Sequence, residues 1–550
     1  MKKKLFFIFL LISAIFIPFK VNAEAVGVTT LEELQTAMAA GGEIRLDADI
    51  NVTTAIGFNK AATLDLNGHT LDLNNKTLAV YRKVTIIDSS TNQSGKITST
   101  ASFAVQVGHS TIATSGNLIV KGGTIEGRGL YGAIRNYETL EIDGGTVVSN
   151  TTYSTGFTVY NQKTLIMKSG TIHSINKNAI QAYTNSTFQM DGGTVVTDAV
   201  GEVAINMYGD CSVIINGGTV EALQDESAAI AIFGNTELTI NGGTITGHDM
   251  AIIGNGNEVS GNVNITINDG TIRGIDAVGM YLPQRNSTTT INGGIIEGPT
   301  AIEIRAGDLI VNNGTITGTS DIYEVIENAN GNTTKGAAIG VSQHTTKQPI
   351  NVTINGSNLK AVVPLCEVNP QNNPKEAIDL IKIEVTQGNF ESTEDESLII
   401  GDGIEIPPFI EGGTYTNDPT NYVKEGYRVI EIPTGYEVTK IHTITIDEKS
   451  KDLITLDETE APYKKSLKFK KIKDKIGYFT IIEMYDTNGN KLNVEVKDNE
   501  FIMPDADIII KVNYKKMVNP PTSDNIYINV LLLLISTIGL TIITKKTLKA

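Results

Sequence analysis

A short glycine-containing motif recurs along the middle of the chain and constrains the fold more than any other feature. It reads apolar-x-apolar, then Asn or Asp, then Gly-Gly-Thr, then Ile or Val, with looser copies that lack one glycine or the threonine. Successive copies follow one another at closely similar intervals, and their last glycines are Gly123, Gly145, Gly170, Gly193, Gly218, Gly243, Gly270, Gly294 and Gly314. Such regular self-similarity is the signature of a repeat architecture.

Three consecutive copies, those ending at Gly193, Gly218 and Gly243, keep one strict period. Apolar residues recur in matched columns and alternate at i and i+2 within each copy, which is strand spacing with one face inward. The columns are Phe188, Val213 and Leu238; Met190, Ile215 and Ile240; Val195, Val220 and Ile245; and Ile180, Ile205 and Ile230. One repeat cannot bury its apolar face alone, whereas stacked repeats close a continuous core, with glycines making the positive-φ turns. The pattern therefore predicts an all-β solenoid with three short strands per turn.

This repeat resembles the right-handed parallel β-helix of the pectin-lyase-like superfamily. The resemblance covers residues 43–420 and is clearest over 115–320. It implies a rod of about fifteen coils, which is ~70 Å long at ~4.8 Å per coil.

Separate elements are predicted at both ends of the solenoid. Residues 24–42 form an N-terminal cap with a short helix, because Thr30 and Glu33 make a capping box. Residues 421–441 are predicted to be a connecting segment. Residues 442–515 alternate like the strands of a small antiparallel β module.

The segment from Met1 to Ala23 is predicted to be a secretory signal peptide. Lys2, Lys3 and Lys4 form a basic start, an apolar run follows, and small residues precede the expected cleavage between Ala23 and Glu24. Signal peptidase is therefore an expected processing enzyme. A retained N-terminal membrane anchor is the alternative interpretation.

The C-terminal end has a polar linker (516–525), an almost uncharged stretch of bilayer length (526–544) and a basic tail (545–550). The linker contains Asn519, Pro520, Pro521, Thr522 and Ser523. In this order, the three parts resemble the cell-wall sorting signal of Gram-positive surface proteins, which implies that a sortase cleaves after Thr522. Asn519 and Ser523 depart from the common Leu-Pro-x-Thr-Gly form. A transmembrane tail that is never cleaved is the alternative, and both place residues 24–518 outside the cell.

Charge and cysteine content exclude several classes of protein. Lys and Arg number 44 against 61 Asp and Glu, and the net charge of −17 is opposite to the basic footprint of a nucleic-acid binder. Two cysteines exclude a disulfide framework and a thiolate zinc module. Cys211 and Cys366 lie about six coils apart, which is too far for a disulfide, so we expect two free, buried thiols. No metal site and no cofactor are predicted.

The resemblance also requires a search for catalytic residues, because the superfamily contains polysaccharide lyases and polygalacturonases. The hydrolase signatures Asn-Thr-Asp, Asp-Asp, His-Gly and Arg-Ile-Lys do not occur in the sequence. Asp143 and Asp191 stand where other repeats have Asn, which indicates turn chemistry. His248 and Asp249 are the single adjacent His–carboxylate pair, and the segment from Asp486 to Asn490 is predicted to be a hairpin turn rather than a calcium loop. No catalytic residue is predicted.

One group of residues points to ligand binding. Tyr183, Tyr208 and Phe233 repeat with the period of the motif, and strand alternation directs them outward beside Gln181 and Asn206. Aromatic rings with flanking amides suit sugar rings and their hydroxyls. The alternative is a surface stack of aromatic rings that only stabilises the sheet.

Together, these observations favour a non-enzymatic, adhesin-like protein of the cell surface, anchored in the wall or membrane. Its β-helical rod is expected to contact a glycan, a host surface or the extracellular matrix. The alternatives are an exported polysaccharide lyase or glycoside hydrolase, and a passive spacer without a ligand.

Overall fold

The structure, a computed structural model, describes residues 24–256, 261–327, 330–394 and 396–518. They form two compact units. The first comprises the chain up to Glu425 together with Val429–Val438, and the second comprises Gly426–Arg428 and the chain from Thr439 onward. The predicted signal peptide, sorting motif, membrane span and basic tail lie outside the described residues. Within the described ranges, no helix is long and apolar enough to cross a membrane.

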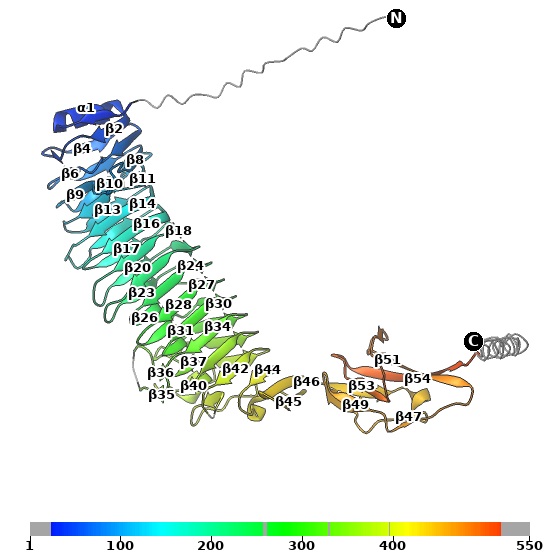
Figure 1. Ribbon diagram of the computed structural model, residues 1–550. Coiled ribbons are helices and arrows are strands. Elements are labelled where there is room, and N and C mark those ends of the chain that lie inside the picture. The colour runs from blue at the N-terminus through cyan, green and yellow to red at the C-terminus, as the bar shows by residue number, and fades with distance from the viewer. Residues whose placement is uncertain (1–23, 257–260, 328–329, 395, 519–550) are drawn as a thin grey trace, which may run out of the picture. The chain divides into compact units, whose positions relative to one another are not determined.

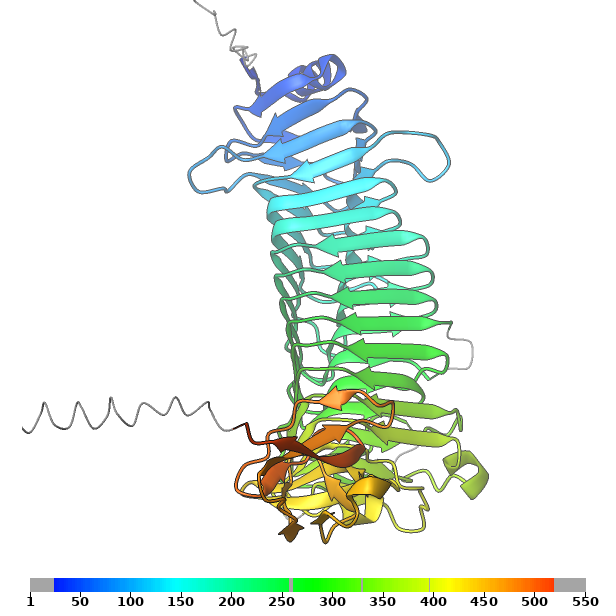
Figure 2. The same cartoon turned by 90° about the vertical axis from the view of Figure 1, so that its right-hand side faces the viewer.

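The first unit is a right-handed parallel β-solenoid of about 14 turns, which confirms the predicted architecture (Figures 1 and 2). Each regular turn contributes three strands that pair in parallel with strands of the adjacent turns. One such turn consists of β20 (Val203–Tyr208), β21 (Cys211–Ile215) and β22 (Thr219–Ala222). Strand β20 belongs to a sheet of 14 strands, from β4 (Ile56–Phe58) to β43 (Leu398–Ile400), which we call the single-strand sheet.

The register between turns reproduces the period of the sequence. Ile205 pairs with Ile230, and Ile215 pairs with Met190 on one side and Ile240 on the other. All five side chains are completely buried. The inward positions of successive turns therefore stack in columns that fill the bore, while alternate residues face outward.

Close packing of the corners explains why glycine recurs in the motif. Gly218 and Gly243 have φ of +91° and +90°, a conformation that side chains with a Cβ rarely adopt. A Cβ added at Gly243 would also lie 2.8 Å from the carbonyl oxygen of Gly218 in the preceding turn. Both the turn conformation and the approach of adjacent corners thus require glycine.

A ladder of side-chain hydrogen bonds joins the Asn or Asp that directly follows the strand before each glycine corner to its counterpart in the preceding turn. Each amide Nδ2 donates to the oxygen of the preceding member over 2.7 to 2.9 Å. This asparagine ladder consists of Asp191, Asn216, Asn241, Asn268, Asn292, Asn312 and Asn355. The Asn or Asp at this position therefore joins adjacent turns by a hydrogen bond, in addition to the role in the turn that the sequence predicts.

The predicted capping box is present at the N-terminal end of the solenoid. Thr30 Oγ1 accepts the backbone N–H of Glu33, and the Glu33 carboxylate accepts the backbone N–H of Thr30. Helix α1 (Leu31–Ala40) follows and packs against β1 (Val26–Val28), β2 (Gly42–Leu46) and β4 (Figure 1). Its buried residues lie against these first strands, whose edge would otherwise be open.

The parallel stack ends with an antiparallel pairing. Strand β46 (Gly435–Ile446) pairs antiparallel with β44 (Gly413–Tyr415), joining Val438 to Gly413. Residues 421–441, predicted as a connecting segment, thus contain β45 (Tyr427–Ile432) and the first half of β46. A reversed strand at this position prevents a further coil from adding in register.

The second unit is a small β module with its own core, which includes Phe469, Phe501 and Ile510. The predicted hairpin is confirmed: β51 (Tyr478–Tyr485) pairs antiparallel with β52 (Lys491–Leu492). The strand pairings within the module are antiparallel, as predicted, except that β46 runs parallel to β54 (Ile508–Lys516). Strand alternation alone does not reveal direction, which depends on how the connections cross.

Both cysteines are free and buried, as predicted. Cys211 lies in β21 and Cys366 in β40 (Val363–Val368). Burial raises the pKa of the Cys211 thiol to about 11 and that of Cys366 to about 12.

Candidate functional site

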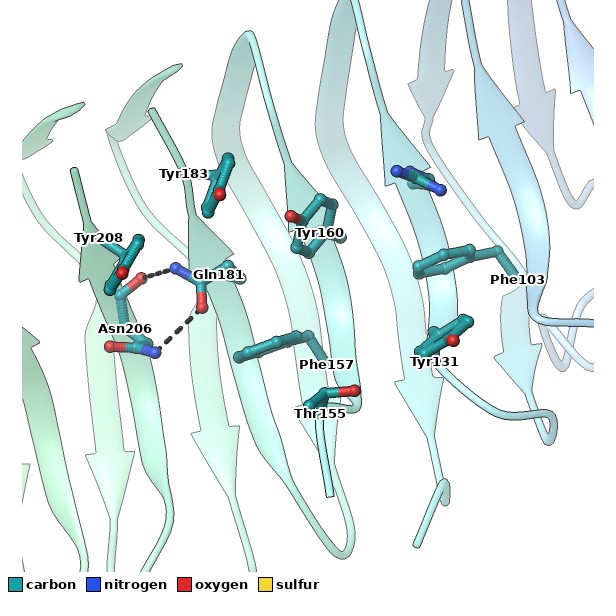
Figure 3. Close-up of a pocket in the computed structure, with 10 residues that line it drawn as sticks. Phe103, Tyr131, Thr155, Phe157, Tyr160, Gln181, Tyr183, Asn206 and Tyr208 are labelled. Atoms are coloured by element: carbon teal, nitrogen blue, oxygen red, sulfur yellow. Dashed lines mark hydrogen bonds between the residues drawn. The ribbon is translucent and has the colours of Figure 1, made fainter. Parts of the chain in front are cut away.

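The strongest candidate site is a cavity on the outer face of the single-strand sheet, which we call the aromatic trough (Figure 3). Its volume is about 550 Å³, within the range of small-ligand sites. The strands that carry it are β10 (Phe103–Val107), β13 (Gly132–Asn136), β15 (Phe157–Asn161), β17 (Asn178–Ala182) and β20. The lining residues are Phe103, Tyr131, Arg135, Thr155, Phe157, Tyr160, Gln181, Tyr183, Asn206 and Tyr208.

One outward column of side chains contributes the centre of the trough. In the parallel register Arg135 pairs with Tyr160, Tyr160 with Gln181, and Gln181 with Asn206. Within each strand the flanking residues face the bore: Ile180 and Ala182, for example, are completely buried on either side of Gln181. Alternation therefore directs the whole column away from the core.

Two amides of this column hold each other in place. Asn206 Nδ2 donates to Gln181 Oε1 at 3.0 Å, and Gln181 Nε2 donates to the carbonyl oxygen of Asn206 at 3.1 Å (Figure 3). Gln181 is only 5% exposed, and Asn206 Oδ1 is buried without a hydrogen-bond partner among the described residues. An acceptor is thus left unused beside the cavity.

Tyrosine rings form one side of the trough. Tyr183 and Tyr208 stack with centroids 5.7 Å apart and an interplanar angle of 9°, and Tyr160 lies 5.7 Å from Tyr183 at 31°. Because these rings stack on one another along the solenoid, much of each ring face is covered. Tyr208 is still 51% exposed. This wall therefore offers ring edges, phenol hydroxyls and the free surface of Tyr208.

A second group of aromatic side chains lies across from the first (Figure 3). Phe103 and Tyr131 stack with centroids 5.7 Å apart at 27°, and Phe157 lies 6.1 Å from Tyr160 at 47°. Tyr153, in the loop before β15, meets Tyr131 edge to face at 5.4 Å. These contacts fix the rings before any ligand binds.

A single guanidinium lies among the rings. The Cζ atom of Arg135 is 4.7 Å from the ring centroid of Tyr137, 5.5 Å from that of Tyr160 and 5.7 Å from that of Phe103. Its Nε is buried and has no hydrogen-bond partner within the described ranges. Cation–π attraction stabilises the charge at this position.

The electrostatic character of the lining is neutral apart from this arginine. None of the ten lining residues is Asp, Glu or His. Burial raises the pKa of Tyr160 above its ordinary value, so its hydroxyl is protonated and available as a donor near neutral pH. The trough can therefore make aromatic contacts, donate and accept hydrogen bonds, and attract an anion.

The structure brings together most of the residues selected from sequence. Tyr183, Tyr208, Gln181 and Asn206 line the trough. Phe233 pairs with Tyr208 in the strand register but is not among the lining residues, so the expected row of three rings contributes two to the cavity. The ring spacing is 5.7 Å rather than the ~4.8 Å strand spacing, since stacked rings slide relative to one another.

Six of the ten lining residues were not predicted from the sequence: Phe103, Tyr131, Arg135, Thr155, Phe157 and Tyr160. Turn length varies in this part of the chain, so the strict period does not extend to it. Tyr160 pairs with Gln181 and not with Tyr183. The high density of aromatic residues between 103 and 160 was the available signal.

Other chemically suggestive residues do not assemble a site. His248 Nε2 lies 3.6 Å from an oxygen of Asp225 and 3.7 Å from one of Asp276, on the loops of neighbouring turns. Asp143 is 3.4 Å from the Lys121 ammonium. The part of the chain that the structure describes contains no group of three or more His, Cys, Asp or Glu residues that could hold a metal ion.

Comparisons with known proteins add no assignment to this geometry. No protein-family model, no curated protein and no solved structure matches the chain.

Proposed function

We propose that this protein is a non-enzymatic, adhesin-like component of the cell surface and that the aromatic trough is its binding site for a glycan. The observation that carries the proposal is the lining itself, which combines six aromatic side chains with two oriented amides. Aromatic groups contact the apolar faces of sugar rings, and amides exchange hydrogen bonds with sugar hydroxyls. The unused acceptor Oδ1 of Asn206 suits a hydroxyl donor.

The direction of the trough favours a chain-like ligand. Its residues come from five successive strands of the single-strand sheet, β10 to β20. At ~4.8 Å between strands, the site spans about 20 Å along the solenoid. Several consecutive sugar units would therefore lie across the strands, along the direction in which turns are added.

The absence of carboxylates from the lining favours binding over hydrolysis at this site. Glycoside hydrolysis ordinarily requires a pair of Asp or Glu side chains on either side of the scissile bond. Neither residue type lines the trough. An exported lyase or hydrolase of the pectin-lyase-like superfamily is the competing proposal, and product formation on pectin, hyaluronan or alginate above a buffer blank would support it.

The proposed location depends on the terminal segments. A secretory signal ending at Ala23 and a sortase-type signal at Asn519–Ser523 would export the chain and attach it to a Gram-positive wall. Mass spectrometry of wall digests tests this attachment. A fragment ending at Thr522 and joined to a cross-bridge is expected, whereas an intact C-terminus through Ala550 contradicts sorting.

Retention of the full-length chain on a glycan array tests the binding site. The informative variant is Tyr208→Ala, which removes an exposed ring of the trough, and we expect roughly tenfold weaker retention because truncating an aromatic anchor costs over about 1 kcal/mol. Tyr208→Phe, which keeps the ring, should retain most of the binding.

Phe233→Ala is the matched control, because Phe233 is paired with Tyr208 but lies outside the lining. Equal losses for the Tyr208 and Phe233 variants would place binding elsewhere. If the wild type retains no glycan, the glycan proposal fails and the passive spacer is favoured.

A further inference from the structure

We infer that the aromatic trough selects glycans that carry an anionic group, a carboxylate or a sulfate, which binds to Arg135. This inference rests on the proposed glycan site and adds the chemical class of its ligand. It depends on the environment of one guanidinium.

Arg135 has no anionic partner among the residues that the structure describes. No ion pair or side-chain hydrogen bond joins it to another residue of the described ranges, and its Nε is buried without a partner. By contrast, Arg45 donates to Asp47 at 2.7 Å, and Arg305 is fully buried with hydrogen bonds to Ser342 and Tyr281. A buried N–H without an acceptor is costly, and the terminal guanidinium nitrogens have no protein acceptor within the described ranges, so a ligand that supplies acceptors is stabilised at this point.

The surrounding rings leave the hydrogen-bonding edge of the guanidinium unused. Phe103, Tyr137 and Tyr160 contact it through cation–π attraction, which acts through ring faces and accepts no conventional N–H bond. The guanidinium N–H groups lie in its plane in a fork that matches the two oxygens of a carboxylate or sulfate. The rings therefore position the fork while leaving its donors free.

Because the chain is acidic overall, Arg135 determines where an anionic glycan can bind. The protein carries a net charge of −17, so its long-range field opposes the approach of anions. The lining of the trough contains one permanent positive charge and no carboxylate. An anionic glycan thus gains affinity only where its charged group reaches Arg135, which gives selectivity instead of nonspecific adhesion.

Matched pairs of sugars test the inference with the full-length chain. The first pair is a hyaluronan octasaccharide and its neutral methyl ester, and the second is a chondroitin octasaccharide with and without sulfate, its uronates methyl-esterified in both. By titration calorimetry, we expect the wild type to bind the anionic member of at least one pair roughly tenfold or more tightly, since a charge-assisted hydrogen bond is worth more than a neutral one. The pair that shows the preference identifies carboxylate or sulfate as the ligand group.

Arg135→Gln should reduce that ratio to near one, because the charge that distinguishes the two members of a pair is no longer recognised. Arg273→Gln is the matched control, since Arg273 is an exposed arginine on another face of the solenoid. Circular dichroism and the unfolding midpoint of Arg135→Gln check that the fold is retained, and Arg135→Lys provides a second variant that keeps the charge and should keep part of the preference.

Equal binding of anionic and neutral sugars by the wild type would overturn the inference and leave the glycan proposal standing. An anionic preference that survives Arg135→Gln would also overturn it. If no member of either pair binds, the inference fails, while the glycan proposal stands or falls with the array.

Discussion

Replacing Asn268 by Asp tests whether the asparagine ladder depends on amide donors. Asn268 Nδ2 donates to Asn241 Oδ1 at 2.8 Å, and Asn268 Oδ1 accepts from Asn292 Nδ2 at 2.9 Å. An ionised Asp keeps the second contact but loses the first, because a carboxylate has no hydrogen to donate. One of its oxygens would then face the oxygen of Asn241.

The structure gives the expected size of the effect. Loss of one exposed hydrogen bond costs about 1 kcal/mol, and repulsion between the facing oxygens adds at most about 1 kcal/mol. We therefore expect Asn268→Asp to lower the free energy of unfolding by about 1 to 2 kcal/mol at pH 7.

Asp191→Asn is the matched control at the end of the same ladder. Asp191 accepts hydrogen bonds from Asn216 at 2.7 Å and from Gln189 at 2.8 Å, and an amide oxygen at this position can still accept both. These two contacts lower the pKa of Asp191, so their charge-dependent contribution is present at neutral pH and is lost as the pH falls through that lowered value. We expect this control to change the unfolding free energy by less than about 1 kcal/mol at pH 7.

Denaturant unfolding followed by circular dichroism at pH 7 and about pH 3 provides the measurement. Protonation of the carboxyl in Asn268→Asp restores a donor toward Asn241 and removes the repulsion between the facing oxygens, so the deficit should shrink at the lower pH. Two results would refute the reasoning. One is that Asn268→Asp is as harmless as Asp191→Asn at pH 7, and the other is a deficit that is unchanged by acid.

Two further predictions concern buried ionisable groups of the solenoid. Burial raises the pKa of Glu367 to about 7, and its Oε2 has no hydrogen-bond partner among the described residues. The stability that Glu367 contributes is therefore present below the pKa of an unfolded carboxyl and is lost as the pH rises through about 7. Glu367→Gln should therefore unfold like the wild type near pH 4 but be more stable by about 3 kcal/mol at pH 9, and equal stability at both pH values would contradict this. The raised pKa values of Cys211 and Cys366 predict that iodoacetamide at pH 8 modifies neither thiol in the folded chain and both thiols in guanidinium. Intact-mass measurement counts the labels, and rapid labelling of the native protein would contradict the prediction.

The periodic part of the fold was predictable because its determinants are local. Apolar residues two positions apart define inward faces, and the recurring glycines define corners, so Ile205, Ile230 and their counterparts could be placed in columns from the sequence. The capping box at Thr30 and the hairpin at Asn488 are likewise encoded within a few residues. Strand direction in the second unit depends on long-range connections, and the parallel pairing of β46 with β54 is the exception to the predicted antiparallel arrangement.

The candidate site was predictable only where the period held. Tyr183 and Tyr208 are one period apart and were found together, whereas Tyr160 lies at a different position along its own strand and was missed. Arg135 gave no periodic signal, and its isolation from carboxylates became visible only when its neighbours across turns were known.

The sequence by itself determined a stacked β-solenoid, since an alternating apolar pattern repeated at nearly constant length can bury its core in no other economical way. Only the tertiary structure decided where the candidate binding site lies on the solenoid. Turns of unequal length bring rings, amides and one guanidinium from five strands into a single trough, and the same packing turns a recurring corner residue into a hydrogen-bonded ladder. Contacts between turns depend on register and loop length together, and neither can be read from one repeat alone.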